Sequence, residues 1–332
     1  QHMTDNASRG GTRRRHAPRP REMRIRSKGV LALMYIVAWS TASSSLIFLN
    51  NHLLTEDGFH YPICLCSMGL AASWTTSSLL VTFGLVRLER SQHMTAGWYV
   101  RHVLPIGGVA ALSLALGNYT YLYLSVSFIQ MLKAIVPFIT MCVMVGCGLE
   151  KPRPDTIAGV IVLTLGTALA AYGEIAFQWV GVAMMITSEF SEALRMAVLQ
   201  FLLGNLRFDL LEGLYVMAPA SLLFLVAGFA VFEYRTFAEE DGFARIANAP
   251  HKYLTAAFLG FLVNLLTLAV IKSTSGLTFK VVGQVKNTVV IVVSVMIFNS
   301  AMTGTQVIGY SIAMVGFWMY QRAKLGVEMS GG

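Results

Sequence analysis

The chain has 332 residues, of which 55% are hydrophobic and only 13% charged, with a net charge of +8. A soluble domain of this size carries about a quarter charged residues. Because the deficit extends along the whole chain, a soluble protein with one anchor is excluded. The length suits about ten membrane-spanning helices of about 20 apolar residues each, so the predicted class is an all-α integral membrane protein.

Basic residues dominate the first 28 positions. Nine of the 25 Lys and Arg residues lie between Arg9 and Lys28, ahead of the first apolar run. This pattern is typical of a disordered cytoplasmic tail held against anionic headgroups. The membrane surface is therefore the expected partner of the tail, and nucleic acid is not.

Ten apolar runs follow the tail. Their backbone polar groups must be bonded internally in hydrocarbon, so each run is predicted to be a helix. The third and fourth runs are nearly continuous through Asn118–Tyr123, which leaves nine spans as the alternative. The runs are Val30–Leu49, Ile63–Leu85, Val103–Asn118, Leu122–Cys147, Thr156–Tyr172, Phe177–Leu203, Leu211–Phe232, Leu254–Ile271, Leu277–Phe298 and Val307–Met319.

Loop charges predict the orientation of the runs. The even-numbered loops carry basic residues, among them Arg87, Lys151 and Lys272, whereas the odd-numbered loops carry acidic residues such as Glu56 and Glu174. The seventh loop mixes both signs. Because basic loops stay in the cytoplasm, ten spans with both termini cytoplasmic are expected.

An internal repeat is visible in the second and fourth quarters of the chain. In each, an intramembrane lysine precedes a run with two glycines seven residues apart. The residues are Lys133, Gly159 and Gly166, then Lys286, Gly309 and Gly316. The lysines lie five spans apart, an odd number, so the halves are predicted to be inverted repeats. The predicted organisation is a tail at 1–28, five-helix repeats at 29–173 and 174–324, and a cytoplasmic tail at 325–332.

Charged residues inside apolar runs are functional candidates, because a charge at the bilayer centre costs at least about 2.5–3.5 kcal/mol. Lys133 and Lys286 have no acidic residue within a turn of their own runs. An ammonium group offers three donors and a compact charge, which suits phosphate oxygens. We predict that an anionic substrate binds both lysines between the halves.

The sixth run carries three further charges. Glu189, Glu192 and Arg195 are spaced i, i+3 and i+6, so they share one helix face. Glu192 and Arg195 are expected to form a structural ion pair, with substrate contact by Arg195 as the alternative. Other polar residues complete the predicted site, although an interhelical hydrogen bond is the alternative role for each. They are Asn50, Ser127, Gln130, Tyr215, Asn264, Gln284 and Asn287.

Three segments carry a resemblance to a known family. They are 125–137 around Lys133, 187–195 ending in Arg195, and 276–287 ending in Lys286-Asn287. In this order and spacing, the chain resembles the triose-phosphate/nucleotide-sugar translocator branch of the drug/metabolite transporter superfamily over about Val30–Lys324. The resemblance implies ten helices in two inverted five-helix repeats. It also implies alternating-access antiport of a phosphorylated or nucleotide sugar against phosphate or a nucleoside monophosphate.

The residue after the ninth-span lysine divides this family. Sugar-phosphate exchangers carry Lys-Arg there, and many nucleotide-sugar members carry Lys-Thr, whereas this chain has Lys286-Asn287. The family's first-span Asn-Lys pair is Asn50-Asn51 here, so that lysine's role does not carry over. The resemblance therefore implies a nucleotide-sugar antiporter, with a UDP-sugar exchanged for the nucleoside monophosphate in the Golgi or endoplasmic reticulum. Lys133 and Lys286 would hold the phosphates.

In this interpretation Arg195 assists the lysines, while Tyr215, Asn264 and Asn287 shape the nucleoside or sugar site. The main alternative is a sugar-phosphate/phosphate exchanger of the plastid inner envelope. An integral-membrane enzyme and a non-transporting receptor are the alternatives from other classes. No cofactor or metal is expected, because the sequence has no Walker A loop, paired-aspartate motif or His/Cys cluster. A monomer or homodimer is expected.

Overall fold

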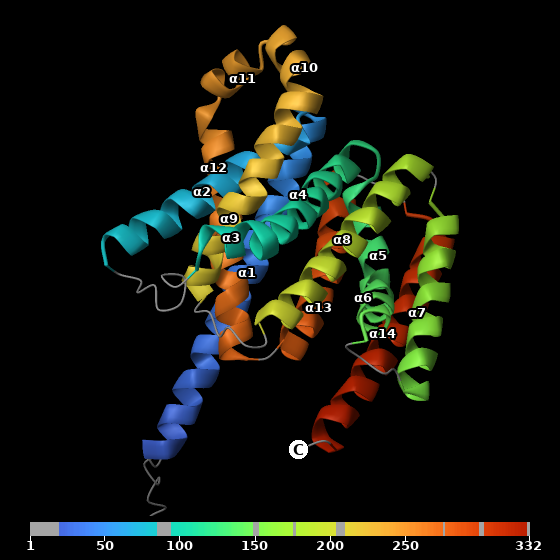
Figure 1. Ribbon diagram of the computed structural model, residues 1–332. Helices are drawn as coiled ribbons and strands as arrows, with labels where there is room; N and C mark the ends of the chain where they lie inside the picture. The colour runs from blue at the N-terminus through green and yellow to red at the C-terminus, as the bar shows by residue number, and fades with distance from the viewer. Residues whose placement is uncertain are drawn as a thin grey trace, which may run out of the picture.

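The computed structural model describes residues 20–84, 94–148, 153–174, 177–203, 210–274, 276–298 and 302–330, and these residues form helices and short connections without strands (Figure 1). The first half contains α1 (Pro20–Thr55), α2 (Pro62–Thr82), α3 (Ala96–Trp98), α4 (Leu104–Tyr119), α5 (Val126–Leu132), α6 (Val136–Gly146) and α7 (Pro154–Tyr172). The second contains α8 (Trp179–Leu203), α9 (Leu210–Gly228), α10 (Tyr234–Glu239), α11 (Gly242–Asn248), α12 (Pro250–Ser273), α13 (Gly276–Phe298) and α14 (Gly304–Ser330). The predicted all-α membrane class is confirmed.

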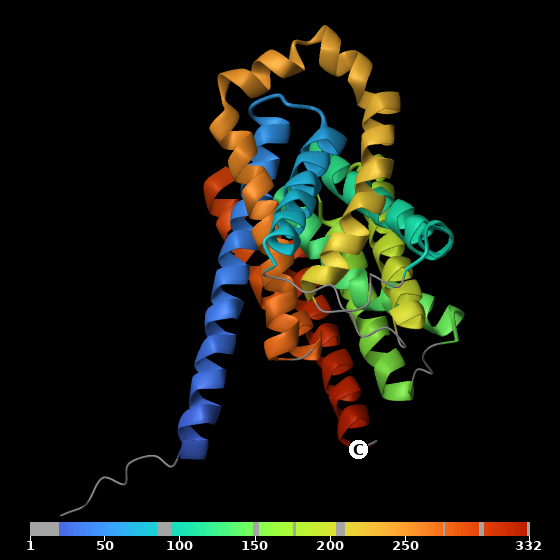
Figure 2. The same ribbon diagram turned by 60° about the vertical axis from the view of Figure 1, so that its left-hand side comes forward.

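The structure changes one predicted boundary, at the start of the first helix, and decides a second, between the third and fourth runs. Helix α1 begins at Pro20, so residues 20–28 of the predicted disordered tail are helical, and the helix projects from the bundle (Figure 2). The rest of that tail lies outside the described residues. The third and fourth runs are separate, because a 3₁₀ turn at Thr120–Leu122 follows the third run before α5 begins at Val126.

Six helical stretches of the described residues are long and apolar enough to cross a membrane. They are Val30–Thr55, Pro62–Thr82, Ala96–Leu122, Val126–Gly146, Pro154–Tyr172 and Tyr215–Glu239, and Val281–Ile297 is a shorter apolar helix. Large apolar side chains also point outward, including Trp179 at 78% and Phe232 at 74% exposure. A lipid environment accounts for such exposure better than water does. The protein is therefore embedded in a membrane by several helices.

Helices α7 and α14 pack side by side through glycines (Figure 1). A Cβ atom on Gly159 would lie 2.6 Å from the backbone nitrogen of Tyr320, and one on Gly316 would lie 2.6 Å from Cα of Leu163. As the residue number rises along α7, the contacted residue number falls along α14, so the two helices are antiparallel. The absence of side chains lets the backbones approach closely.

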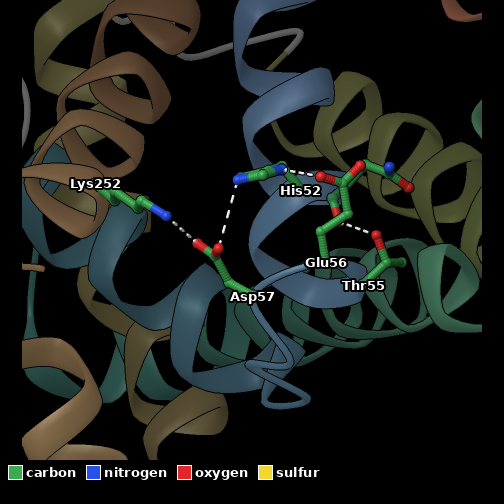
Figure 3. Close-up of polar contacts among 6 residues, drawn as sticks. His52, Thr55, Glu56, Asp57 and Lys252 are labelled. Carbon is green, nitrogen blue, oxygen red and sulfur yellow. Dashed lines mark hydrogen bonds and ion pairs between the residues drawn. The ribbon is translucent and has the colours of Figure 1, made fainter. Parts of the chain in front are cut away.

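Helices α10 and α11 arch over the turn between α1 and α2 (Figure 2); we call this the α10–α11 end. Figure 3 shows the polar contacts at that turn: Asp57 Oδ2 lies 2.6 Å from Lys252 Nζ, His52 Nδ1 lies 2.6 Å from Glu56 Oε2, and His52 Nε2 lies 3.4 Å from Asp57 Oδ1. Because Lys252 belongs to α12, these contacts join the α1–α2 turn to the start of α12.

Aromatic residues fill the same end. The ring of Phe59 lies 5.1 Å from Tyr61, 6.1 Å from Phe237 and 4.8 Å from Tyr253, and all four are buried. The Tyr61 hydroxyl donates to Glu240 at 2.9 Å. Burial and this carboxylate raise the pKa of Tyr61 to about 12, so the phenol remains a donor at neutral pH. A continuous cluster of buried residues thus packs beneath the α10–α11 end.

A buried carboxylate ties the start of α2 to the end of α9. Glu233 lies in the π-helical turn Phe229–Glu233 and is 3% exposed. Its two oxygens accept from the backbone N–H groups of Ile63 and Cys64 at 2.8 and 2.9 Å, and Tyr119 donates to it at 2.8 Å. These N–H groups belong to the first turn of α2, which has no other intrahelical partners for them. The positive end of the helix also favours the carboxylate.

Candidate substrate site between two lysines

Lys133 lies at a break between two helices. Pro137, in the first turn of α6, has no N–H, and its ring would clash with the carbonyl of Lys133 four residues earlier. The chain therefore forms a tight turn at Lys133–Ile135, in which the Lys133 carbonyl accepts from the N–H of Val136. Broken helices of this kind often contribute to binding sites in transporters. The Lys133 side chain is half-buried.

Lys286 lies within the continuous helix α13 and points toward α1. Its Nζ atom donates a hydrogen bond to Ser43 Oγ at 3.1 Å and lies 5.3 Å from the ring centroid of Trp39. Ser43 and Trp39 are 9% and 6% exposed. A hydroxyl and an aromatic face both stabilise an ammonium group, so α1 supplies the surroundings of the second lysine.

The two lysines lie on neighbouring helices. Helix α5, which ends immediately before Lys133, packs against α13, which carries Lys286. Glu189 of α8 lies close enough to Lys133 for their charges to interact. Two cations held close together repel each other, and a bound anion would remove that repulsion.

Arg195 is engaged with its neighbour on α8. Its Nε atom donates to Glu192 Oε2 at 2.8 Å, and a second, very short bond joins the guanidinium to the other carboxylate oxygen. Such a two-bond arrangement fixes both side chains. The ion pair that the i, i+3 spacing predicts is therefore present, on the helix that carries Glu189.

Three of the amide side chains in the predicted site form hydrogen bonds between helices. Asn50 of α1 donates to Asn118 of α4 at 3.1 Å, and Asn264 of α12 donates to Ser73 of α2 at 3.3 Å. Gln284 of α13 donates to the Tyr310 hydroxyl of α14 at 3.2 Å. Each of these contacts corresponds to the alternative role of an interhelical hydrogen bond.

The remaining predicted residues are placed as follows. Gln130 is fully buried, and both polar atoms of its amide have no hydrogen-bond partner among the described residues. Ser127 is buried and lies 3.2 Å from Ser125 at the start of α5. Tyr215 packs with an apolar cluster around Val216. Asn287 is half-buried beside Lys286.

The structure places the two lysines on packed helices, and it adds Ser43 and Trp39 beside Lys286, which the sequence alone does not indicate. Their i, i+4 spacing places both on one face of α1, but serine and tryptophan are common enough in membrane helices to give no signal alone. Among the described residues, no group of three His, Cys, Asp or Glu side chains is placed to hold a metal ion. Lysine ammonium groups in such surroundings are suited to binding an anion.

Comparison with known proteins gives matches over nearly the whole chain. The sequence model of the Triose-phosphate Transporter family matches residues 30–321. One solved crystal structure shares the fold, with a TM-score of 0.54 over 89% of this chain and 97% of the other, at 14% identity. At that identity the likeness concerns the fold alone.

Several curated relatives come from Arabidopsis thaliana. A probable sugar phosphate/phosphate translocator is 33% identical over 306 residues, which cover 89% of this chain and 79% of the relative. A second protein with that description is 33% identical over 93% of this chain and 92% of its own length. UDP-uronic acid transporter 1 is 28% identical over 87% of this chain and 94% of its own length.

Proposed function

The chain belongs to the Triose-phosphate Transporter family, and from that premise we propose that it exchanges a nucleotide sugar for a nucleoside monophosphate across a membrane. A UDP-sugar is the first candidate substrate. The observation that carries the proposal is the pair Lys133 and Lys286, which come from different halves of the chain and lie on the packed pair of helices α5 and α13. Phosphate groups bound between them would be shared by both halves.

Asn287 is the reason for preferring a nucleotide sugar. The side chain next to Lys286 is half-buried and uncharged, so this position adds an amide rather than a further cation. An amide both donates and accepts hydrogen bonds, which suits a base or a sugar hydroxyl better than a terminal phosphate. The likeness to UDP-uronic acid transporter 1 supports this preference.

A sugar phosphate/phosphate exchanger is the second candidate. The names of the 33% identical relatives favour it, and the lysine pair suits inorganic phosphate as well as a diphosphate. The two candidates differ in whether the ligand needs a base, and that difference is directly measurable.

We also propose that the chain consists of two inverted five-helix repeats that cross the membrane ten times. The helix contacts support this division: α1 packs on α12 as α8 packs on α4, and α12 packs on α2 as α4 packs on α9. In the inverted repeat, α8 is the counterpart of α1, α9 of α2 and α12 of α4. Exchanging each helix for its counterpart converts the first contact of each comparison into the second. The pairs α5 with α13 and α7 with α14 map onto themselves.

Exchange would then proceed by rocking the halves about the lysine pair. The packed cluster beneath α10 and α11 supports a state closed at that end. With the positive-inside rule, this is the non-cytoplasmic end, and both termini face the cytoplasm. An endomembrane location follows from a nucleotide-sugar substrate, and the plastid inner envelope follows from the second candidate.

Thermal stability of the purified protein in detergent tests the proposal. The ligands are UDP, UMP, GDP, GMP, CMP, several nucleotide sugars, triose phosphates and inorganic phosphate. A ligand that binds the folded state stabilises it by about 2.7 kcal/mol at a hundredfold excess over its dissociation constant. We expect stabilisation by one nucleoside monophosphate and its sugar conjugates. Stabilisation by phosphate and triose phosphates alone would favour the second candidate instead.

A further inference from the structure

Lys286 occupies a defined position against α1. Ser43 and Trp39 lie one helical turn apart on that helix, and both contact the ammonium group, at 3.1 Å to the hydroxyl and 5.3 Å to the ring centroid. Both side chains are buried. The ammonium of Lys286 is therefore held against α1 and does not extend freely.

The residues that hold Lys286 are uncharged. Among the described residues, no carboxylate forms an ion pair with it. A hydroxyl and an aromatic ring stabilise the ammonium without cancelling its charge. A phosphate oxygen offers the same ammonium a charge-assisted hydrogen bond, which is stronger than a bond to a neutral acceptor. The present contacts are thus strong enough to position Lys286 and weak enough to be replaced.

The aromatic member of this pair is itself fixed. Trp39 Nε1 donates to Thr267 Oγ1 of α12 at 2.9 Å, and its ring packs 4.7 Å from the ring of Phe279 on α13. A ring held on two sides cannot follow an ammonium that moves toward a ligand. Movement of Lys286 to a phosphate would therefore break its contacts with α1.

We propose that Ser43 and Trp39 form a resting site for Lys286 in the substrate-free protein, and that the phosphate of the substrate competes with them for the ammonium group. The proposal rests on the proposed function and adds two positioning residues on α1 to it. Neither residue binds substrate in this scheme. Their contacts stabilise the empty state alone, so they lower the affinity for every phosphorylated ligand.

Ser43→Ala tests the proposal through a gain of affinity, which structural damage would not produce. The hydrogen bond is lost only from the empty state, so the concentration of UMP or inorganic phosphate that gives half-maximal thermal stabilisation should fall about three- to tenfold. The KM for exchange should fall in parallel. Ser45→Ala is the matched control, because Ser45 lies on the exposed side of the same helix and should leave both values unchanged.

If the ligand concentration for half-maximal stabilisation is unchanged in Ser43→Ala, Lys286 keeps its contact with Ser43 when ligand binds. If that concentration rises, Ser43 contacts the ligand. Either result overturns the resting site. If Ser43→Ala does not fold, Trp39→Phe weakens the ring contact and should lower the value in the same way. If no phosphorylated ligand stabilises the wild-type protein, the proposed function fails as well. If ligand stabilises the wild-type protein but not Lys286→Ala, and Ser43→Ala has the wild-type ligand affinity, the resting site is wrong while the proposed function stands.

Discussion

Lys286→Ala is expected to abolish exchange while leaving the protein folded. The substitution removes the charge that the substrate phosphate would share with Lys133, and a hydrogen bond to a charged group contributes about 1.5–3 kcal/mol. Loss of one such bond alone reduces transport roughly ten- to a hundredfold, and the loss of the charge itself adds to this effect. Among the described residues, the folded state loses the polar and ring contacts of Lys286 with Ser43 and Trp39, and it no longer holds a charge that is costly to keep from water. Uptake into proteoliposomes and the melting temperature measure the two effects.

Lys280→Ala is the control for that experiment, because it removes the same residue type from the same helix at a position nearer the helix end. We expect it to transport normally. If Lys286→Ala retained transport at the wild-type rate, the lysine would be removed from the mechanism. If it lost its melting transition, the side chain would be structural rather than part of a binding site.

Gly166→Leu is expected to prevent α7 and α14 from packing, and Gly166→Ala to weaken the packing measurably. A Cβ atom at this position would lie 2.8 Å from Cα of Ala313 and from the carbonyl oxygen of Gly309, both backbone atoms of α14. Backbone atoms cannot rotate away as a side chain does, so the helices must separate. Overpacking of this kind costs about 1–3 kcal/mol for small additions and more for larger ones.

The melting temperature and the elution profile in detergent report this effect. Gly166→Ala should melt below wild type, and Gly166→Leu should yield little monodisperse protein. Gly69→Ala is the control: a Cβ atom there meets nothing within 4 Å, and alanine is the better helix former by about 1 kcal/mol. Equal melting temperatures for Gly166→Ala and wild type would contradict the close approach of the two helices.

The helices themselves follow from the sequence because their cause is local. An apolar run of about 20 residues must satisfy its own backbone in a membrane, and the described residues of these runs lie mostly in helices. The break at Lys133 also has a local cause in Pro137. The helix at residues 20–28 and the helices α10 and α11 are different, because polar or mixed segments carry no such requirement. The seventh predicted loop, whose charges have both signs, therefore does not indicate the helices α10 and α11 that form there.

The candidate site is predictable only in its charges. Lys133 and Lys286 are conspicuous because charge is rare in apolar runs. The roles of the amides depend on which helices meet, and the sequence does not contain that information directly. Asn50 and Gln284 are used between helices, while Ser43 and Trp39 surround Lys286 from a helix more than 240 positions away. Glu233 follows the seventh apolar run, and its role depends on its contact with the start of α2, which the sequence does not reveal.

In the proposed mechanism, the lysine pair binds phosphorylated ligands for obligatory exchange. Proteoliposomes containing the purified protein test it most directly, with uptake of a labelled nucleotide sugar compared between vesicles preloaded with UMP, with inorganic phosphate or with buffer alone. We predict rapid uptake into UMP-loaded vesicles, little uptake into buffer-loaded vesicles, and none with Lys133→Ala or Lys286→Ala. Equal uptake into UMP-loaded and buffer-loaded vesicles, unaffected by either lysine substitution, would contradict both the exchange and the site.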